Sequence, residues 1–341
     1  MHYWWLLLAS ACVALAQDVD FAVGQKFQII LSAVPNLATL PLVPADAPVW
    51  DIDLWDSDNS TIAGLKALGK IVICYFSAGT SEDWRPDYGS FAAADKGSVL
   101  PEWKGENWLR LGSANVRAIM AARIQMAASK GCDAIDPDNT DGYFEPSFRH
   151  TNIQQSNTNS LNLQMSDSID FMKFLVTTAA SYGLKTGLKN SLQILPNVMS
   201  IVDFAVNEQC GQFGECAAYV DFIASAKPVF HIEYPAKAPT VLASEKSADC
   251  TNLGVTGLST VLKELSLAGW VGYCDGSQAI TNTKPGSGGN PWTTRPPPPT
   301  TRPTSTSTSK KPTTTTTAKP TTTRTTTSSA PTTTPGGGTP G

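Results

Sequence analysis

The stretch at residues 132–138, CDAIDPD, places a short apolar run directly before two aspartates. A run of this length, bounded by Gly131 and Asn139, is typical of a buried strand. Seven more runs of this kind occur along the chain, at residues 27–32, 49–55, 70–78, 185–190, 204–209, 228–234 and 271–274. The sequence therefore predicts eight short strands.

Stretches with helical spacing of apolar residues lie between most of these strands. Residues 115–130 and 166–182 each stop at a glycine, which is a common helix end. Residues 58–68 and 258–268 are shorter helix candidates. Eight strands alternating with helices over roughly 250 residues predict an α/β fold of the (β/α)₈, TIM-barrel type. An open doubly wound sheet is the alternative, although no GxGxxG motif supports it.

Residues 281–341 differ sharply in composition from the rest of the chain. Twelve of the 24 prolines lie between Pro285 and Pro340, and this stretch contains no Asp or Glu. Thr, Ser, Gly, Lys and Arg make up nearly all of the remainder, so the segment cannot bury enough apolar surface to order itself. We predict a disordered, O-glycosylated linker at 281–341, which follows one folded domain at 17–280.

Near its N-terminus the chain has an apolar run at residues 4–16, WWLLLASACVALA. This run is too short to span a bilayer, and Ala14-Leu15-Ala16 fits the small-x-small pattern that signal peptidase recognises. We predict a signal peptide at 1–16, and hence a secreted, extracellular protein without stable membrane insertion. An N-terminal membrane anchor is the alternative.

The charges are unevenly distributed along the chain. The whole chain has a formal net charge of −4, but its last seven basic residues, from Lys284 onward, stand among no acidic ones. The preceding part has 18 Lys and Arg against 29 Asp and Glu, which gives −11. Nucleic-acid binding needs a basic footprint, so this balance argues against such a partner and favours a neutral or cationic ligand.

Removal of residues 1–16 would leave six cysteines, namely Cys74, Cys132, Cys210, Cys216, Cys250 and Cys274. An even number in a secreted chain indicates disulfide bonds, although six cysteines allow 15 connectivities. Cys210 and Cys216 are close enough to close one loop, with Cys250–Cys274 and Cys74–Cys132 as the other candidate pairs. A zinc site is disfavoured because no CxxC pair occurs and only His150 and His231 remain. We expect neither a metal nor a cofactor.

Polar and charged side chains gather at the carboxyl ends of the predicted strands. They are Asp53, Tyr75, Asp136, Asp138, Lys189, Asn190, Glu208 and Glu233. In a barrel these strand ends converge on one face, where catalytic residues come from several strands. Each acid alone could instead cap a following helix or loop. So many strand ends together favour an active site.

Carboxylates are the main chemical groups of this candidate site. The densest acidic segment holds Asp136, Asp138, Asn139 and Asp141, and Glu208 ends a strand two positions further around the predicted barrel. Two acids on separate strands suit glycoside hydrolysis, in which one protonates the leaving oxygen and the other attacks or activates water. A calcium site is the alternative for the three aspartates. Four tryptophans are candidates for stacking on sugar rings, with packing against helices as the alternative: Trp55, Trp84, Trp103 and Trp108.

Several ordered motifs make the sequence similar to a known enzyme family. They are WDIDLWD (50–56), ICYFSAGTSEDWRPD (73–87), ENWLRL (106–111), GCDAIDPDNTDGY (131–143), GLKN (187–190), FAVNEQC (204–210) and FHIEY (230–234). The chain thereby resembles glycoside hydrolase family 114, the endo-α-1,4-polygalactosaminidases, from about Phe27 to Cys274. The resemblance implies a TIM-type barrel that cleaves partly deacetylated galactosaminogalactan.

The resemblance also implies roles for individual residues. Asp138, in PDN, matches the nucleophile, and Glu208, in NEQC, matches the general acid/base of a retaining mechanism. Compared with the family pattern, this chain carries extra residues around 150–160. The candidate substrate-binding residues are Asp53, Tyr75, Asp136, Asn139, Asp141, Lys189, Asn190, Glu233 and Tyr234.

Three functions from different classes are consistent with these features. The favoured one is a monomeric, secreted endo-glycosidase that acts on α-1,4-linked galactosamine, a cationic polymer that suits the charge of −11. A non-catalytic carbohydrate-binding barrel would not need the acid pair. A polysaccharide deacetylase usually needs a metal held by histidines, which are scarce here.

Overall fold

The computed structural model describes residues 19–101, 103–143 and 160–288. The predicted signal peptide at 1–16, the extra residues at 150–159 and most of the predicted linker lie outside this part of the chain. None of the helices within it is long and apolar enough to cross a bilayer.

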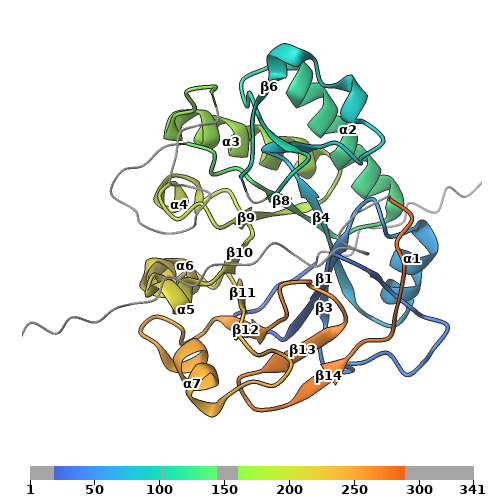
Figure 1. Cartoon of the computed structure of the whole chain (residues 1–341), viewed down its shortest axis with the longest axis vertical. Helices are drawn as coiled ribbons and strands as arrows, with labels where there is room; N and C mark the ends of the chain where they lie inside the picture. Colours follow the sequence, from blue (N-terminus) through green and yellow to red (C-terminus); the bar gives the residue numbers. More distant parts are fainter. Residues whose placement is uncertain (1–18, 102, 144–159, 289–341) are drawn as a thin grey trace, which may run out of the picture. The chain divides into compact units, whose positions relative to one another are not determined.

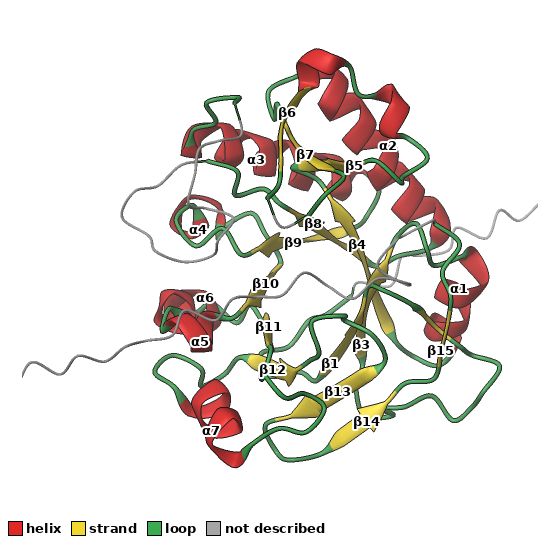
Figure 2. Ribbon diagram, in the orientation of Figure 1, coloured by secondary structure: helices red, strands yellow, loops and turns green. Residues whose placement is uncertain are grey.

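A curled sheet forms the centre of the fold, with helices packed around it (Figures 1 and 2). Eight parallel strands are neighbours in chain order: β1 (Phe27–Ile30), β3 (Val49–Asp53), β4 (Ile71–Ser77), β8 (Ala134–Asp138), β9 (Lys185–Lys189), β10 (Phe204–Glu208), β11 (Val229–Glu233) and β12 (Ser259–Leu262). A side-chain hydrogen bond links the last of these strands to the first. Lys263, directly after β12, donates from Nζ to Oε1 of Gln28 on β1 over 3.0 Å. The predicted α/β barrel of the TIM type is confirmed.

The eighth parallel strand is not where the sequence pattern placed it. Residues 258–268 were expected to be helical, yet they contain β12. The run predicted as the last strand is β13 (Trp270–Tyr273), which pairs antiparallel with β12 and with β14 (Gln278–Ile280). Burial explains the difference. Val261 packs in the barrel interior with Phe230, and the free energy of this burial outweighs the helix propensity that the apolar spacing at 258–268 indicates.

The helices lie on the outer side of the sheet. They are α1 (Asn59–Ala67), α2 (Ala114–Lys130), α3 (Met165–Ser181), α4 (Leu195–Val198), α5 (Cys210–Phe213), α6 (Val220–Ala224) and α7 (Ala243–Thr251), with short 3₁₀ turns at η1 (Tyr88–Ser90), η2 (Ala93–Asp95) and η3 (Cys216–Tyr219). α2 begins where Ser113 Oγ accepts from the Val116 amide and ends at Gly131, whose φ of 90° needs a glycine. The helices predicted at 58–68, 115–130 and 166–182 are confirmed, apart from shifts of one residue at their ends.

Two smaller sheets complete the fold. β5 (Thr80–Glu82), β6 (Lys96–Val99) and β7 (Glu106–Leu109) form an antiparallel sheet between β4 and α2. β15 (Thr283–Lys284) pairs with β2 (Val34–Pro35). Beyond β15, the Gly288 amide donates to Asp56 Oδ1 over 2.6 Å. The described fold thus continues past residue 280, where composition predicted the end of the folded domain.

Alternate residues of each strand face the barrel interior, because side chains in a strand alternate between its two faces. On β10, Phe204 and Val206 pack inside the barrel, whereas Ala205 packs outside against the helical layer. Glu208 lies on the same face as Phe204 and Val206. Its side chain therefore points into the mouth of the barrel, above an apolar interior.

Three disulfide bonds join Cys74 to Cys132, Cys210 to Cys216 and Cys250 to Cys274. These are the three candidate pairs of the sequence analysis. The Cys210–Cys216 bond closes the short loop that follows β10, and so restrains the chain two residues after Glu208.

Candidate active site

Three strand ends present the central side chains of the site. Asp138, Lys189 and Glu208 are the last residues of β8, β9 and β10. Each is followed by a residue in the left-handed region, with φ of 59° at Asn139, 48° at Asn190 and 66° at Gln209. Asparagine adopts this conformation more readily than most residues. The chain therefore turns away sharply at each strand end and leaves the preceding side chain in the barrel mouth.

Asp138 is surrounded by hydrogen-bond donors. Its Oδ2 accepts from the Tyr75 hydroxyl at 2.9 Å and from Lys189 Nζ at 3.1 Å, and its Oδ1 accepts from the Asn139 amide at 2.7 Å. Three donors fix the orientation of this carboxylate. Gly79 allows this turn to approach, because a Cβ there would lie 1.7 Å from the Asn139 carbonyl oxygen.

Glu208 lies opposite Asp138, across Lys189. Its Oε2 is 3.0 Å from Lys189 Nζ, its Oε1 accepts from the Tyr234 hydroxyl, and its amide donates to Asn190 Oδ1 over 2.9 Å. Because Asp138 Oδ2 and Glu208 Oε2 lie 3.1 Å and 3.0 Å from the same nitrogen, they are at most about 6.1 Å apart. This limit is below the separation of about 6.5–9.5 Å typical of inverting glycosidases.

Burial and neighbouring charges set the ionisation of the groups around the pair. Burial opposes the charge of Lys189, but Asp138 and Glu208 outweigh it and hold the pKa of Lys189 well above its ordinary value. Burial, reinforced by Asp138 for Tyr75 and by Glu208 for Tyr234, raises the pKa of both phenols well above the ordinary value. Both hydroxyls therefore keep their protons and donate to the carboxylates.

Two adjoining cavities share Tyr75, Trp103, Glu106, Asp138 and Glu208, and so form one cleft at the barrel mouth. Six of the predicted substrate-binding residues line it, namely Asp53, Tyr75, Asn139, Asp141, Lys189 and Asn190. Of the four candidate tryptophans, Trp103 lines both cavities. Trp108 is buried in the core instead.

The small antiparallel sheet adds acidic residues that the sequence analysis missed. Glu82 on β5 and Glu106 on β7 stand opposite each other in register, and both line the cleft. Arg85 donates to both carboxylate oxygens of Asp53, at 3.1 and 2.6 Å, and to Glu82 Oε2 at 3.0 Å. The motifs SEDWRPD and ENWLRL contain these residues, but nothing in their local periodicity shows that they reach the barrel mouth.

Asp136 does not line the cleft but lies beneath it. It is fully buried two residues before Asp138, and the Asp51 carboxyl of β3 faces it. None of the carboxylate oxygens of either residue has a hydrogen-bond partner in the described part of the chain that meets the usual distance limit. Burial raises the pKa of Asp136 to about 7, and burial together with Asp136 raises that of Asp51. The pair therefore retains a proton under conditions in which ordinary aspartates are ionised.

Glu233 is also absent from the cleft, contrary to expectation. On β11, Phe230 and Ile232 face the barrel interior, so Glu233 faces outward and Tyr234 inward. Glu233 Oε1 accepts from the Gly211 amide at 2.7 Å and contacts His231 Nε2 at 2.7 Å. Because neighbouring side chains of a strand point to opposite faces, the sequence pattern alone indicates that only one of Glu233 and Tyr234 can enter the barrel mouth.

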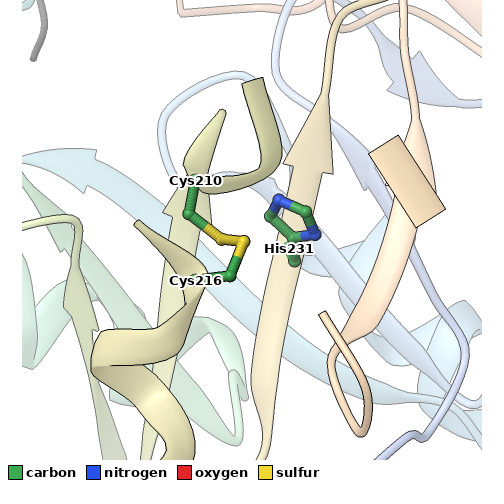
Figure 3. A group of neighbouring side chains, drawn as sticks. All are labelled: Cys210, Cys216 and His231. Carbon is green, nitrogen blue, oxygen red and sulfur yellow. A yellow bond between two sulfur atoms is a disulfide. The ribbon is translucent and has the colours of Figure 1, made fainter. Parts of the chain in front are cut away.

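Figure 3 shows the one group of potential metal ligands in the described part of the chain, namely Cys210, Cys216 and His231. The two sulfur atoms are joined in a disulfide, so neither is available as a thiolate ligand. His231 Nδ1 lies 2.9 Å from Thr260 Oγ1, and its other nitrogen contacts Glu233. These three side chains therefore pack against one another and do not form a metal site. A calcium ion at Asp138 is likewise disfavoured by the Lys189 cation beside it.

The arrangement of a carboxylate pair in the mouth of a TIM-type barrel matches a family of known enzymes. Residues 9–279 match the glycoside-hydrolase family GH114. The chain belongs to glycoside hydrolase family 114. It is therefore a glycoside hydrolase, and the resemblance noted in the sequence is confirmed.

Solved structures agree with this membership. Ega3 of Aspergillus fumigatus, determined in complex with galactosamine, is 44% identical, with a TM-score of 0.67, over 76% of this chain and 99% of that chain. The glycoside hydrolase domain of PelA from Pseudomonas aeruginosa shares the fold at 16% identity and a TM-score of 0.54, over 71% of this chain and 95% of that domain. A comparison with curated protein sequences finds no match.

Proposed function

We propose that this protein is a secreted, monomeric endo-glycosidase that hydrolyses α-1,4-linked galactosamine by a retaining mechanism, with Asp138 and Glu208 as its catalytic residues. The observation that carries the proposal is the placement of both carboxylates on one lysine. Their facing oxygens lie at most about 6.1 Å apart. A covalent glycosyl-enzyme intermediate requires a separation of about 5–5.5 Å.

The environments of the two acids favour different roles. Asp138 accepts three hydrogen bonds and its side chain is 16% exposed, which suits a nucleophile held in one orientation. Glu208 is more exposed, at 25%, which suits a group that exchanges its proton with the leaving oxygen and then with water. Asp138 would attack the anomeric carbon while Glu208 protonates the departing oxygen. Glu208 would then deprotonate the water that releases the sugar.

Three observations support galactosamine as the sugar. The relative that is 44% identical was crystallised with galactosamine. The part of the chain before Lys284 has a formal charge of −11, which attracts a polymer of protonated amino sugars. The cleft itself is lined by several carboxylates and by Trp103, whose ring offers an apolar face for a sugar.

The three disulfides support an extracellular location.

Product analysis tests this function and separates it from the alternatives. Incubation with a partly deacetylated α-1,4-galactosamine polymer should release oligosaccharides, and NMR should show α-configured reducing ends first. Asp138→Asn and Glu208→Gln should each lower kcat by about 10³-fold or more, as expected for removal of a catalytic group. Asp221→Asn, an exposed change on α6, should leave kcat unchanged.

Other outcomes would contradict the proposal. Acetate release without oligosaccharides indicates a deacetylase, and binding without products indicates a carbohydrate-binding protein. A β-configured first product indicates inversion.

A further inference from the structure

We propose that Glu106 binds the free ammonium group of the sugar and thereby selects unacetylated galactosamine units in the cleft. This inference rests on the proposed function, which it extends from a polymer to a particular chemical group. It concerns substrate selection at Glu106 and assigns that residue no part in bond cleavage.

The position of Glu106 places its carboxylate among the catalytic groups. It lies on β7 and lines both parts of the cleft together with Asp138, Glu208 and Trp103. A sugar held beside Asp138 therefore lies within reach of Glu106. The indole of Trp103 offers a neighbouring flat surface for the apolar face of the same ring.

The charges of the cleft leave Glu106 without a cation. Arg85 pairs with Asp53 and Glu82, and Lys189 pairs with Asp138 and Glu208. Glu106 forms no ion pair within the described ranges, although the residue is only 7% exposed. A carboxylate that is buried without a cationic partner is costly, so a bound ammonium group would be stabilised there.

A short hydrogen-bond network fixes Glu106 relative to Asp138. Thr80 donates from Oγ1 to Glu106 Oε2 over 2.9 Å, and Thr80 Oγ1 in turn accepts from Asn139 Nδ2 over 3.2 Å. Asn139 Nδ2 also donates to Ser77 Oγ over 2.9 Å, and the Asn139 amide donates to Asp138 Oδ1. An ammonium group on Glu106 would therefore stand at a defined position relative to the nucleophile.

The chemistry of acetylation makes this contact selective. A free amine is a cation with three N–H donors, whereas an acetamido group is neutral, has one N–H donor and is bulkier. Binding an acetylated unit would bury Glu106 without its cation and lose a charge-assisted hydrogen bond. Sites built to bind a polar group reject analogues that lack it, because the site's own buried group is then left unpaired.

The ionisation of Glu106 supplies a second signature. Burial and the facing carboxylates Glu82 and Asp138 raise its pKa well above the ordinary value, while Arg85 opposes this shift. Below its pKa, Glu106 carries a proton and attracts no cation. The preference for the free amine should therefore grow as pH rises above the range in which ordinary glutamates titrate, as long as the sugar amine stays protonated.

The experiment compares galactosamine and N-acetylgalactosamine as ligands, with affinities measured by NMR titration at several pH values. Wild type, Glu106→Gln and the control Asp221→Asn are tested in parallel, together with hydrolysis of free-amine and N-acetylated polymers. Glu106→Gln should weaken galactosamine binding by about tenfold or more, as expected for loss of a charged partner. The variant should bind N-acetylgalactosamine at least as well as wild type does, because the buried charge that this sugar leaves unpaired is gone. The pH dependence of the preference should decrease in Glu106→Gln, and Asp221→Asn should behave as wild type.

Each remaining outcome is decisive. An equal loss for both sugars in Glu106→Gln, or an undiminished preference, would overturn the inference. If that variant does not fold, Glu106→Asp, which withdraws the carboxylate by one methylene group, replaces it, and an undiminished preference for galactosamine in this variant overturns the inference. If wild type prefers galactosamine to N-acetylgalactosamine as expected but cleaves neither polymer, the proposed function is refuted. The role of Glu106 in binding the ammonium group is then retained.

Discussion

Lys189 forms ion pairs with both candidate catalytic carboxylates of the cleft. It is buried at the end of β9, between the strands that carry Asp138 and Glu208, and contacts both carboxylates. A lysine in this position allows two acids to stand close together without strong mutual repulsion. It also excludes a metal ion from the same space. Its role is to position and balance the pair, while the acids perform the chemistry.

Replacement of Lys189 by methionine should therefore impair catalysis strongly. Methionine is similar in length but leaves the two carboxylates without their shared cation. Breaking a buried ion pair typically costs about 3–5 kcal/mol of folding free energy, which should lower Tm. Because the two carboxylates also lose the group that positions them, we expect kcat to fall by roughly 10²-fold or more. Steady-state kinetics on the free-amine polymer, with a thermal melt of each protein, measure the effect. Lys173→Met, at an exposed position on α3, is the matched control, and a Lys189→Met variant with wild-type kcat would refute this role.

Asp136 should make stability depend on pH in an unusual direction. Its pKa is about 7 in the folded protein and near 3.8 in an unfolded chain, because burial disfavours its charge. Between these pH values the folded state holds a proton that the unfolded state has released, so the free energy of unfolding falls as pH rises. Asp136→Asn should remove the part of this decline that Asp136 causes, on the order of a few kcal/mol, while buried Asp51 keeps its own contribution.

Urea unfolding of wild type and Asp136→Asn at pH 4, 5, 6 and 7 measures that difference. The difference between their free energies of unfolding should change progressively from pH 4 to pH 7, with the variant relatively more stable at the higher pH. Asp221→Asn, which changes an exposed acid, should follow wild type. Parallel curves for wild type and Asp136→Asn would show that Asp136 is ionised throughout.

At the scale of elements, strand alternation decides which side chains enter the site. On β8 and β10 the inward face carries Asp138 and Glu208, and on β11 the outward face carries Glu233. The small sheet of β5, β6 and β7 contributes Glu82 and Glu106 from a segment inserted between β4 and α2. The barrel strands thus supply the candidate catalytic pair, and the inserted sheet supplies one wall of the cleft.

The C-terminal boundary of the enzyme should lie after β15. Truncation after Gly288 should leave kcat and Tm unchanged, because the removed segment is rich in Pro and Thr and poor in apolar residues. Truncation after Ile280 removes β15 and the Gly288 contact with Asp56, and should lower Tm by roughly 2–8 °C. Calorimetry and activity of both truncated proteins check this. Equal Tm values for the two would show that β15 contributes nothing to stability.

At the scale of the whole molecule, net charge should govern substrate capture. The part before Lys284 carries a formal −11, and the cleft contains more acids than bases. Attraction between this surface and a polycation acts over the Debye length, about 10 Å at 0.1 M salt, and weakens as salt is added. The charge therefore raises the rate of encounter, whereas specificity depends on contacts within the cleft.

Raising the ionic strength from 0.05 to 0.5 M should thus increase KM for the free-amine polymer by roughly tenfold while changing kcat little. The fully N-acetylated polymer is the control, since it carries no charge for salt to screen. Initial rates over a range of substrate concentrations separate KM from kcat. An equal salt response for both polymers would mean that the acidic surface plays no part in binding.

The sequence by itself determined the alternation of strands and helices, the strand ends that carry Asp138 and Glu208, and the disulfide candidates. These features depend on short-range patterns of burial, turn residues and spacing, which are written locally in the chain. Only the tertiary structure decided that β12 is a strand, that Lys189 joins the two acids, and that Glu106 reaches the cleft. These features depend on contacts between segments far apart in the sequence. The free energy of burying such segments together outweighs local propensity, and no local pattern records it.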